Sequence, residues 1–145
     1  MNANGNRLAC NLTMLKEIVR HLRDALPDEG CGLLATVDEG KVRRAVRFFP
    51  GDNVDRSPTR FTMDPCQVVD AMEQIERAGW RLGAIVHSHP ANLATPSTTD
   101  LREAYFPGVW LAIMSLAGAD AELRIWDISD GDGTPREVPL LTESI

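Results

Sequence analysis

Residues 81–100 have the sequence RLGAIVHSHPANLATPSTTD, the most informative stretch of the chain. The nearly unbroken apolar run from Arg81 to His87 predicts a strand buried on both faces, in the interior of a sheet. Pro90 ends this strand just after its histidines. The segment Ser97-Thr-Thr-Asp100 predicts the first turn of a short helix that continues to about Tyr105.

Three side chains of this stretch can converge on a metal ion. In a strand, residues i and i+2 point to the same side, so His87 and His89 present two imidazoles to one position. Asp100 can return a carboxylate to that position, across a loop of seven residues between His89 and Ser97. Two nitrogens and one oxygen, with a fourth position left for water, are typical of a catalytic zinc site, although iron or manganese also suits such a set.

Each half of this pattern also has a purely structural interpretation. Ser-x-x-Asp is a common helix N-cap, and a His-x-His pair can simply be two strand residues. Here the two halves occur together, at the end of a predicted buried strand, in a chain with only three histidines. We therefore predict a metal site formed by His87, His89 and Asp100.

A hydrolytic metal centre also needs a base that takes a proton from water. Glu29 is the candidate because it directly precedes a predicted apolar strand over 31–37, and Gly30 and Gly32 allow close approach of the backbone. A solvated acid in a loop is the alternative interpretation of Glu29 and of its neighbour Asp28.

The rest of the chain alternates between helix and strand signals. Apolar residues recur every three or four positions over 13–26, which predicts a helix that ends at Pro27. The remaining predicted elements are a hairpin of 31–37 and 41–49, a loop over 53–59, an extended piece over 60–63, a helix from Asp64 to Gly79, and strands over 109–116, 122–128 and 138–141. This alternation predicts an α/β fold, with helices packed on a mixed sheet, in a single domain over residues 1–145.

Composition and charge exclude several classes of function. The 15 basic and 21 acidic residues give a formal net charge of −6, so no basic field attracts nucleic acid or an anionic membrane. No apolar run is long enough to span a bilayer, and the polar amino terminus lacks the apolar core of a secretory signal. The 3 cysteines lack the spacing of a thiolate zinc site, and their odd number argues against a disulfide framework. We expect a cytoplasmic protein without nucleic-acid or membrane partners.

Together, Glu29, His87-x-His89-Pro90 and Ser97-x-x-Asp100 resemble the JAMM (MPN-plus) metalloprotease motif. The similarity covers nearly the whole chain and is to the small bacterial stand-alone members. It includes Pro27-x-Glu29-x-Cys31-Gly-Leu-Leu34, Asn53-Val-Asp-Arg-Ser-Pro58 followed by Arg60-Phe61, and Leu123-Arg-Ile-Trp126. The least typical position is Gly30, where we expect alanine or serine.

The resemblance implies an MPN fold and a role for each motif residue. His87, His89 and Asp100 would bind zinc, Glu29 would be general base and then general acid, and Ser97 would hydrogen-bond the tetrahedral oxyanion. A helix N-cap role for Ser97 is compatible with this. The implied activity is that of a zinc metallopeptidase or isopeptidase that cleaves at the carboxyl-terminal Gly-Gly of a ubiquitin-like (β-grasp) sulfur-carrier protein.

Two other functions stay open at this point. A zinc amidohydrolase that acts on small amide conjugates would use the same residues, and a non-catalytic module could dock a ubiquitin-like partner. A complete ligand set with a base argues against the module, because docking needs neither. For a carrier substrate, we expect the Gly-Gly tail to lie against a strand edge, with the loop 92–96 as a wall of its groove.

Other conspicuous residues have structural interpretations. We expect Cys31 to be a small buried apolar residue and not a nucleophile. His21 falls on the polar side of the first helix, where solvent exposure is expected. Arg43, Arg44 and Arg47 predict a solvated strand face, with an acidic partner as the alternative.

Overall fold

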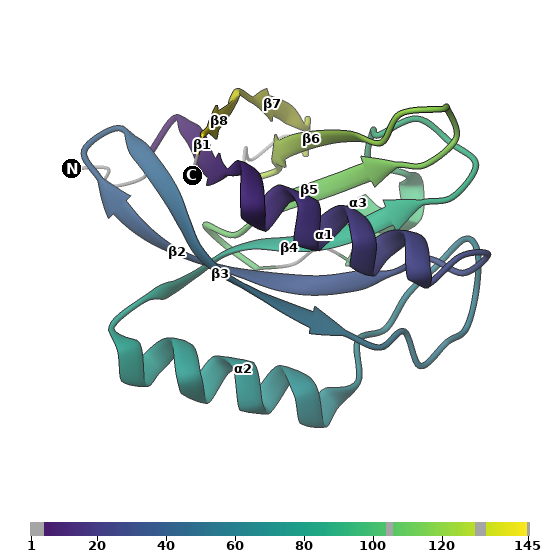
Figure 1. The fold of residues 1–145 in the computed structure, drawn as a ribbon, viewed down its shortest axis with the longest axis horizontal. Helices are drawn as coiled ribbons and strands as arrows, with labels where there is room; N and C mark the ends of the chain where they lie inside the picture. The colour runs from purple at the N-terminus through teal and green to yellow at the C-terminus, as the bar shows by residue number, and fades with distance from the viewer. Residues whose placement is uncertain (1–4, 104–105, 130–132, 145) are drawn as a thin grey trace.

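The computed structural model describes residues 5–103, 106–129 and 133–144. Within these residues, three helices pack on one eight-stranded mixed sheet (Figure 1), which confirms the predicted fold class. The strands are β1 (Arg7–Asn11), β2 (Cys31–Glu39), β3 (Val42–Gly51), β4 (Arg81–His89), β5 (Trp110–Ser115), β6 (Glu122–Asp127), β7 (Arg136–Val138) and β8 (Leu140–Glu143). The helices are α1 (Leu12–Asp24), α2 (Pro65–Ala78) and α3 (Thr98–Glu103). The strand order in the sheet is β7-β6-β5-β4-β2-β3-β1-β8.

Helix α1 covers one face of the sheet. Its apolar positions Met14, Ile18 and Leu22 recur every four residues and form one buried cluster with side chains of the strands, among them Leu34 of β2 and Val86 of β4. The helix ends at Asp24, two residues before the predicted boundary. The cluster includes residues of β1 to β7, so the main core lies between α1 and the sheet.

Helix α2 covers the opposite face and has the predicted boundaries. The Asp64 side chain accepts a hydrogen bond from the backbone N–H of Cys66, and Gly79 ends the helix in the left-handed conformation, with φ of 75°. Ala71 and Ile75 pack against β2 and β3 in a second buried cluster. No helix among the described residues is long and apolar enough to cross a membrane.

Strand β4 lies in the interior of the sheet, as its apolar sequence predicts. It pairs antiparallel with β2 and parallel with β5, and it continues past the apolar run to His89, just before Pro90, the residue predicted to end it. In the β2–β4 register, Cys31 is paired with His87, so the residues just before β2 lie beside the end of β4. This register brings the predicted base and the predicted metal ligands to the same end of the sheet.

Both ends of the chain differ from the prediction. Residues 7–11, for which no element was predicted, form β1, which pairs parallel with both β3 and β8. The single strand predicted over 138–141 is wrong, because β7 ends at Val138 and β8 begins at Leu140, at opposite ends of the strand order. Pro139 separates them because it has no N–H to continue a ladder. Of the extended piece predicted over 60–63, Met63 alone forms a bridge, with Asn53.

The prediction of a solvated face is wrong for Arg43. Since β1 pairs with β3, Arg43 lies inside the sheet and its side chain is fully buried. Its guanidinium lies 3.7 Å from the ring centroid of Trp110 and donates to the carbonyls of Gly83 and Gly108, both at 2.9 Å. Packing and hydrogen bonds to the backbone replace the expected solvent.

The two neighbouring arginines lie at the surface. Arg44 is half-buried and forms ion pairs with Glu39 and Glu143. Arg47 is exposed, as predicted, and donates to the side chain of Gln74 at 2.9 Å.

Candidate metal centre and active site

The three predicted metal ligands lie together at the carboxyl end of β4. His87 and His89 project from the same face of the strand, and Asp100 comes from the first turn of α3. The Nε2 atoms of the two histidines are 3.3 Å apart. Oδ1 of Asp100 is 3.1 Å from Nε2 of His87, and Oδ2 is 3.0 Å from Nε2 of His89. All three side chains are at least nine-tenths buried.

The surroundings orient both imidazole rings. Nδ1 of His89 donates to the carbonyl of Leu93 at 2.8 Å, which directs Nε2 toward Asp100. The ring of His87 stacks on Phe61, with centroids 4.7 Å apart and planes at 23°. Each ring therefore has one contact that fixes its plane and one nitrogen that faces the cluster.

Asp100 is held by the start of its own helix. The N–H of Ser97 donates to Oδ2 of Asp100 at 2.9 Å, and the N–H of Asp100 donates to Oγ of Ser97 at 3.0 Å. This reciprocal pair is a capping box, so the N-cap interpretation of Ser-x-x-Asp is correct. The same cap turns the carboxylate toward the two histidines, and the two interpretations are not exclusive.

The cluster shifts the pKa values of its own members. Burial by itself raises the pKa of Asp100, but hydrogen bonds with His87 and His89 outweigh it and hold that pKa well below its ordinary value. Burial lowers the pKa of His89, but hydrogen bonds with Asp100 and Leu93 leave it raised. Without a cation, therefore, a proton shared with Asp100 compensates the buried carboxylate.

The donor set fits a tetrahedral metal ion. Bonds of about 2.0 to 2.1 Å to a tetrahedral zinc ion separate neighbouring ligand atoms by about 3.3 Å. The two histidine Nε2 atoms are 3.3 Å apart, and each lies 3.0 to 3.1 Å from a different oxygen of the Asp100 carboxylate, so that one ligand atom from each residue lies within 4.8 Å of the others. A divalent cation among them would replace the shared proton and neutralise the buried carboxylate. Among the described residues, His87, His89 and Asp100 are the group of histidine, cysteine and acidic side chains whose ligand atoms lie close enough together to hold a metal ion.

Glu29 is a buried acid beside this cluster. Its residue is 3% exposed, so the solvated-loop interpretation is wrong. Its Oε1 atom is buried and has no hydrogen-bond partner among the described residues. Burial raises the pKa of Glu29 to about 7, while the charge of His89 lowers it and that of Asp100 raises it. A carboxyl group with a pKa near neutrality and a free oxygen is suited to accept and return a proton.

Gly30 shows why this chain departs from the expected alanine or serine. A Cβ atom at this position would lie 2.8 Å from Cδ2 of Leu22 and 3.1 Å from Cβ of Ala25. Helix α1 therefore packs directly on the backbone that follows Glu29.

His21 and Cys31 lie near the same segment. The prediction that His21 is solvent-exposed is wrong, because it is half-buried and Nε2 donates to the carbonyls of Cys31, at 2.9 Å, and Gly51, at 3.0 Å. Cys31 is fully buried, as predicted, and burial raises the pKa of its thiol to about 12. Its thiol is thus kept protonated and unreactive at neutral pH.

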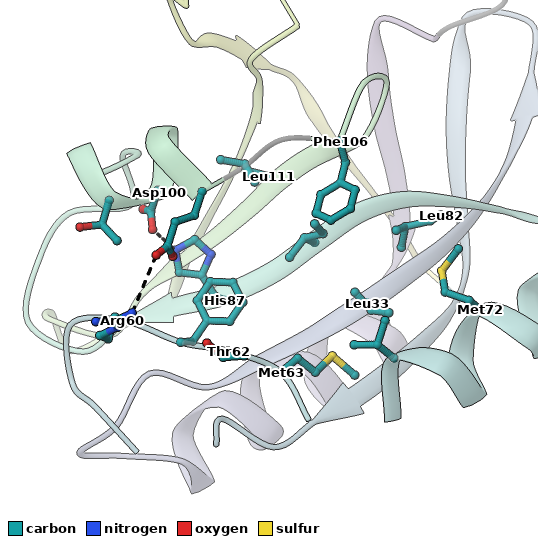
Figure 2. Close-up of a pocket in the computed structure, with 15 residues that line it drawn as sticks. Leu33, Arg60, Thr62, Met63, Met72, Leu82, His87, Asp100, Phe106 and Leu111 are labelled. Atoms are coloured by element: carbon teal, nitrogen blue, oxygen red, sulfur yellow. Dashed lines mark ion pairs between the residues drawn. The ribbon is translucent and has the colours of Figure 1, made fainter. Parts of the chain in front are cut away.

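An apolar pocket of about 430 Å³ adjoins the cluster (Figure 2). His87 and Asp100 lie at one end, while Met72 and Leu82 lie at the other. The side chains between them are mostly apolar and include Leu33, Phe61, Met63, Ile85, Phe106 and Leu111. At the polar end, Arg60 and Glu103 form an ion pair of 3.9 Å.

The loop 92–96, which we expected to form a groove wall, does not line this pocket. Instead it supports the ligands. The Leu93 carbonyl holds His89, Ala94 is buried against β5, and the Ala94 carbonyl accepts a hydrogen bond of 2.8 Å from Trp126.

Three residues of the site region were not assigned a role from the sequence. Phe61 stacks on His87, Ser88 binds the backbone of Gly30, and Asn53 binds the backbone of Glu29. Phe61 and Asn53 belong to the stretch that carries the resemblance, which was the one available signal. Ser88, between the two histidines, carried no signal in the sequence that would have indicated its role.

A mixed sheet with two histidines at the end of an interior strand, an aspartate on the next helix and a buried glutamate beside them defines the JAB/JAMM class of domains. The sequence matches the family described as prokaryotic homologs of the JAB domain over residues 12–129, and the chain belongs to that family.

Several named proteins are similar to this chain over more than half of their length. The CysO-cysteine peptidase of Mycobacterium tuberculosis is 31% identical over 137 residues, which is 94% of this chain and 92% of the relative. The desampylase of Haloferax volcanii is 32% identical over 118 residues, which is 78% of this chain and 84% of that protein. The probable TtuB-protein conjugate cleaving protease of Thermus thermophilus is 41% identical over 92 residues, 63% of this chain and 59% of the relative.

Solved structures show the same fold. The solution structure of a Desulfitobacterium hafniense protein superposes with a TM-score of 0.85 at 33% identity, and covers 95% of this chain and 94% of its own. A Salinibacter ruber protein superposes with a TM-score of 0.69 at 30% identity, over 93% and 91% of the two chains.

Proposed function

We propose that this chain, as a single JAMM-type domain over residues 1–145, is a zinc-dependent metallopeptidase. Its substrate would be a peptide or isopeptide bond at the carboxyl-terminal Gly-Gly of a ubiquitin-like sulfur-carrier protein. The observation that carries the proposal is the convergence of three metal-ligand side chains, with contacts of 3.0 to 3.3 Å between their nitrogen and oxygen atoms, beside a buried glutamate. Relatives named as a peptidase, a conjugate-cleaving protease and a desampylase support the same reaction class.

In this mechanism, His87, His89 and Asp100 hold the zinc ion. Zinc bound there would supply a Lewis acid for the attacking water and the scissile carbonyl. Glu29 accepts the proton of the water and then returns it to the leaving amine, since its carboxyl group is buried beside the ligands and its Oε1 has no hydrogen-bond partner among the described residues.

Ser97 can contribute while it caps α3. Its Oγ accepts the N–H of Asp100, and this leaves its own hydroxyl hydrogen to donate. A hydrogen bond from that hydroxyl to the developing oxyanion would stabilise the transition state. Cap and oxyanion donor are therefore compatible roles of one side chain.

The apolar pocket supports a polypeptide substrate over a small amide. It extends from His87 and Asp100 to Met72 and Leu82, and so offers apolar contacts well away from the bond that is cleaved. An extended tail with two glycines would pass the crowded metal end, while larger side chains before them would occupy the pocket.

The test compares substrates that differ in size. Zinc-loaded protein is incubated with a ubiquitin-like carrier whose terminal Gly-Gly is amide-linked to cysteine, with the same carrier linked to a lysine side chain, and with small N-acyl amino-acid amides. Mass spectrometry identifies the products, and a carrier that ends in Val-Val is the matched control. We expect cleavage after Gly-Gly by the wild type and none by Glu29→Gln.

Other outcomes identify the alternatives. Hydrolysis of the small amides without cleavage of either carrier conjugate would establish a zinc amidohydrolase. Binding of the carrier without hydrolysis of any substrate would establish a docking module. Full activity with iron or manganese and none with zinc would show that the metal is not zinc, while the proposed class of reaction would stand.

A further inference from the structure

One asparagine side chain connects the candidate base to the loop beside the metal ligands. Asn53 is half-buried and lies two residues after the end of β3, in the segment that leads to α2. Its side-chain Nδ2 donates to the carbonyls of Glu29 at 3.0 Å, Arg60 at 3.0 Å and Ser57 at 3.4 Å, and Oδ1 accepts the N–H groups of Asp55 at 3.0 Å and Thr62 at 3.1 Å. Both the donor and the acceptor capacity of the amide are used by the backbone.

These hydrogen bonds hold Glu29 through its main chain. The carbonyl of Glu29 accepts from Asn53, and the N–H of Glu29 donates to the carbonyl of Ser57 at 2.8 Å. In contrast, Oε1 of Glu29 has no hydrogen-bond partner among the described residues. The direction of the carboxylate therefore depends on its backbone, which the loop around Asn53 fixes on both sides.

The same amide fixes a contact of a metal ligand. Arg60 and Thr62, the two residues on either side of Phe61, are both bound by Asn53 through their backbones. Phe61 stacks on the ring of His87, with centroids 4.7 Å apart. One side chain thus sets the position of the base segment and of the aromatic ring that packs on a ligand.

We propose that Asn53 is a positioning residue for the hydrolytic reaction. It fixes the backbone of Glu29 and the ring of Phe61, which stacks on His87, relative to each other. The inference rests on the proposed function for the identity of the reaction. The Asn53 side chain binds the backbone of Glu29 and of the loop around Phe61, and it acts on the site through these backbone contacts. A displacement of about 1 Å in such groups can lower a rate by about 100-fold.

Two variants distinguish the role of the N–H donor of the Asn53 amide from the role of its oxygen acceptor. Asn53→Ala loses all the hydrogen bonds, whereas Asn53→Asp keeps an acceptor for Asp55 and Thr62 but loses the donor to the Glu29 carbonyl. We expect kcat with the carrier conjugate to fall by about 10- to 100-fold in both variants, with KM within about threefold of the wild type. Zinc content, measured by elemental mass spectrometry, should stay at the wild-type value.

The matched control is Asn11→Ala. Asn11 is also an asparagine that binds backbone, through a 2.7 Å bond from Met14 N–H to its side chain, but it caps α1 away from the Glu29 carbonyl. It should lose this cap and keep the wild-type kcat. A kcat of Asn53→Asp within twofold of the wild type would overturn the proposal, as would equal losses of kcat in Asn53→Asp and Asn11→Ala.

Amide hydrogen exchange tests the positioning without any substrate. The Glu29 N–H should exchange at least tenfold faster in Asn53→Ala than in the wild type, while the N–H of Ile113 in the core should not change. Unchanged protection of Glu29 would overturn the proposal. If the wild type cleaved no substrate, the proposed function would fail and this measurement would still decide whether Asn53 holds Glu29.

Discussion

Ser88 and Gly30 exchange a reciprocal pair of hydrogen bonds: Gly30 N–H donates to Oγ of Ser88 at 2.8 Å, and Ser88 N–H donates to the Gly30 carbonyl at 3.0 Å. Ser88 is fully buried between the two candidate ligands, His87 and His89. The pair joins the strand that carries these ligands to the segment that carries Glu29. The distance between base and metal site is therefore set by two short contacts, one of them made by the Ser88 side chain.

Ser88→Ala should destabilise the protein by about 1 to 3 kcal/mol, because the buried N–H of Gly30 loses its acceptor. Urea unfolding measures this loss. Ser129→Ala is the matched control, since Ser129 is exposed and binds Asp127 of its own loop, and its effect should be within about 0.5 kcal/mol. Equal effects of the two substitutions would mean that the Ser88 hydroxyl does not hold the base segment.

Metal content tests the candidate ligands. Wild-type protein supplied with zinc and then dialysed should retain about one zinc ion per chain, and His89→Ala should retain almost none, because two donors remain of three. His21→Ala is the control: it removes another half-buried histidine, which lies outside the cluster and binds the carbonyls of Cys31 and Gly51. It should bind zinc like the wild type. Zinc retained by His89→Ala would place the metal elsewhere.

Glu29→Gln should separate metal binding from the reaction. Glutamine has the shape of glutamate but cannot accept the proton of water, so kcat should fall by at least about 100-fold. The metal ligands are unchanged, and zinc content should equal that of the wild type. Steady-state kinetics with the carrier conjugate, with elemental analysis of the same samples, provides both values. An active Glu29→Gln variant would assign the base to another residue.

The raised pKa of Glu29 predicts how stability depends on pH. In metal-free protein, Glu29 keeps its proton up to about pH 7, whereas in the unfolded chain it loses the proton near 4.5. Since the folded state binds more protons in this window, the contribution of Glu29 to stability is full below pH 4.5 and is lost as the pH rises through 7.

The loss amounts to about 3 kcal/mol at most, the equivalent of the pKa difference. Glu29→Gln lacks this titration, so its stability relative to the wild type should rise between pH 5 and pH 8. Urea unfolding in the presence of a chelator, at several pH values, measures the difference. Parallel stability curves for the two proteins would show that Glu29 is not held in a desolvated position.

Much of the fold follows from local signals. The β2–β3 hairpin, helix α2 and the interior strand β4 were predicted because a turn, a cap and an apolar run each lie within a few residues. Strand β1 was missed because it is stabilised by parallel pairing with β3 and β8, which are distant in sequence. The burial of Arg43 follows from the same pairing and was missed with it.

The candidate site likewise has one part that local sequence signals predict and another that depends on contacts between distant segments. The spacing of His87, His89 and Asp100 is short, so strand and helix geometry sufficed to predict that they converge. Phe61 and Asn53 reach the site through a loop whose path depends on its own hydrogen bonds, and no periodicity describes such a loop. The contacts of Phe61 and Asn53 depend on how this loop packs against β4.

Pro139 is the single residue between β7 and β8, yet these strands are the two ends of the strand order. One residue spans only about 7 Å between its neighbours, so the sheet curls until its edges meet there. Val138 of β7, at one end of the order, and Leu8 of β1, next to the other end, accordingly share the cluster around α1. A cut at this link would remove no core side chain, but it would let the two edge strands β7 and β8 separate, and an exposed strand edge can pair with strands of other molecules. The proline link thus holds the two ends of the strand order together, a task separate from the chemistry at the far end of β4.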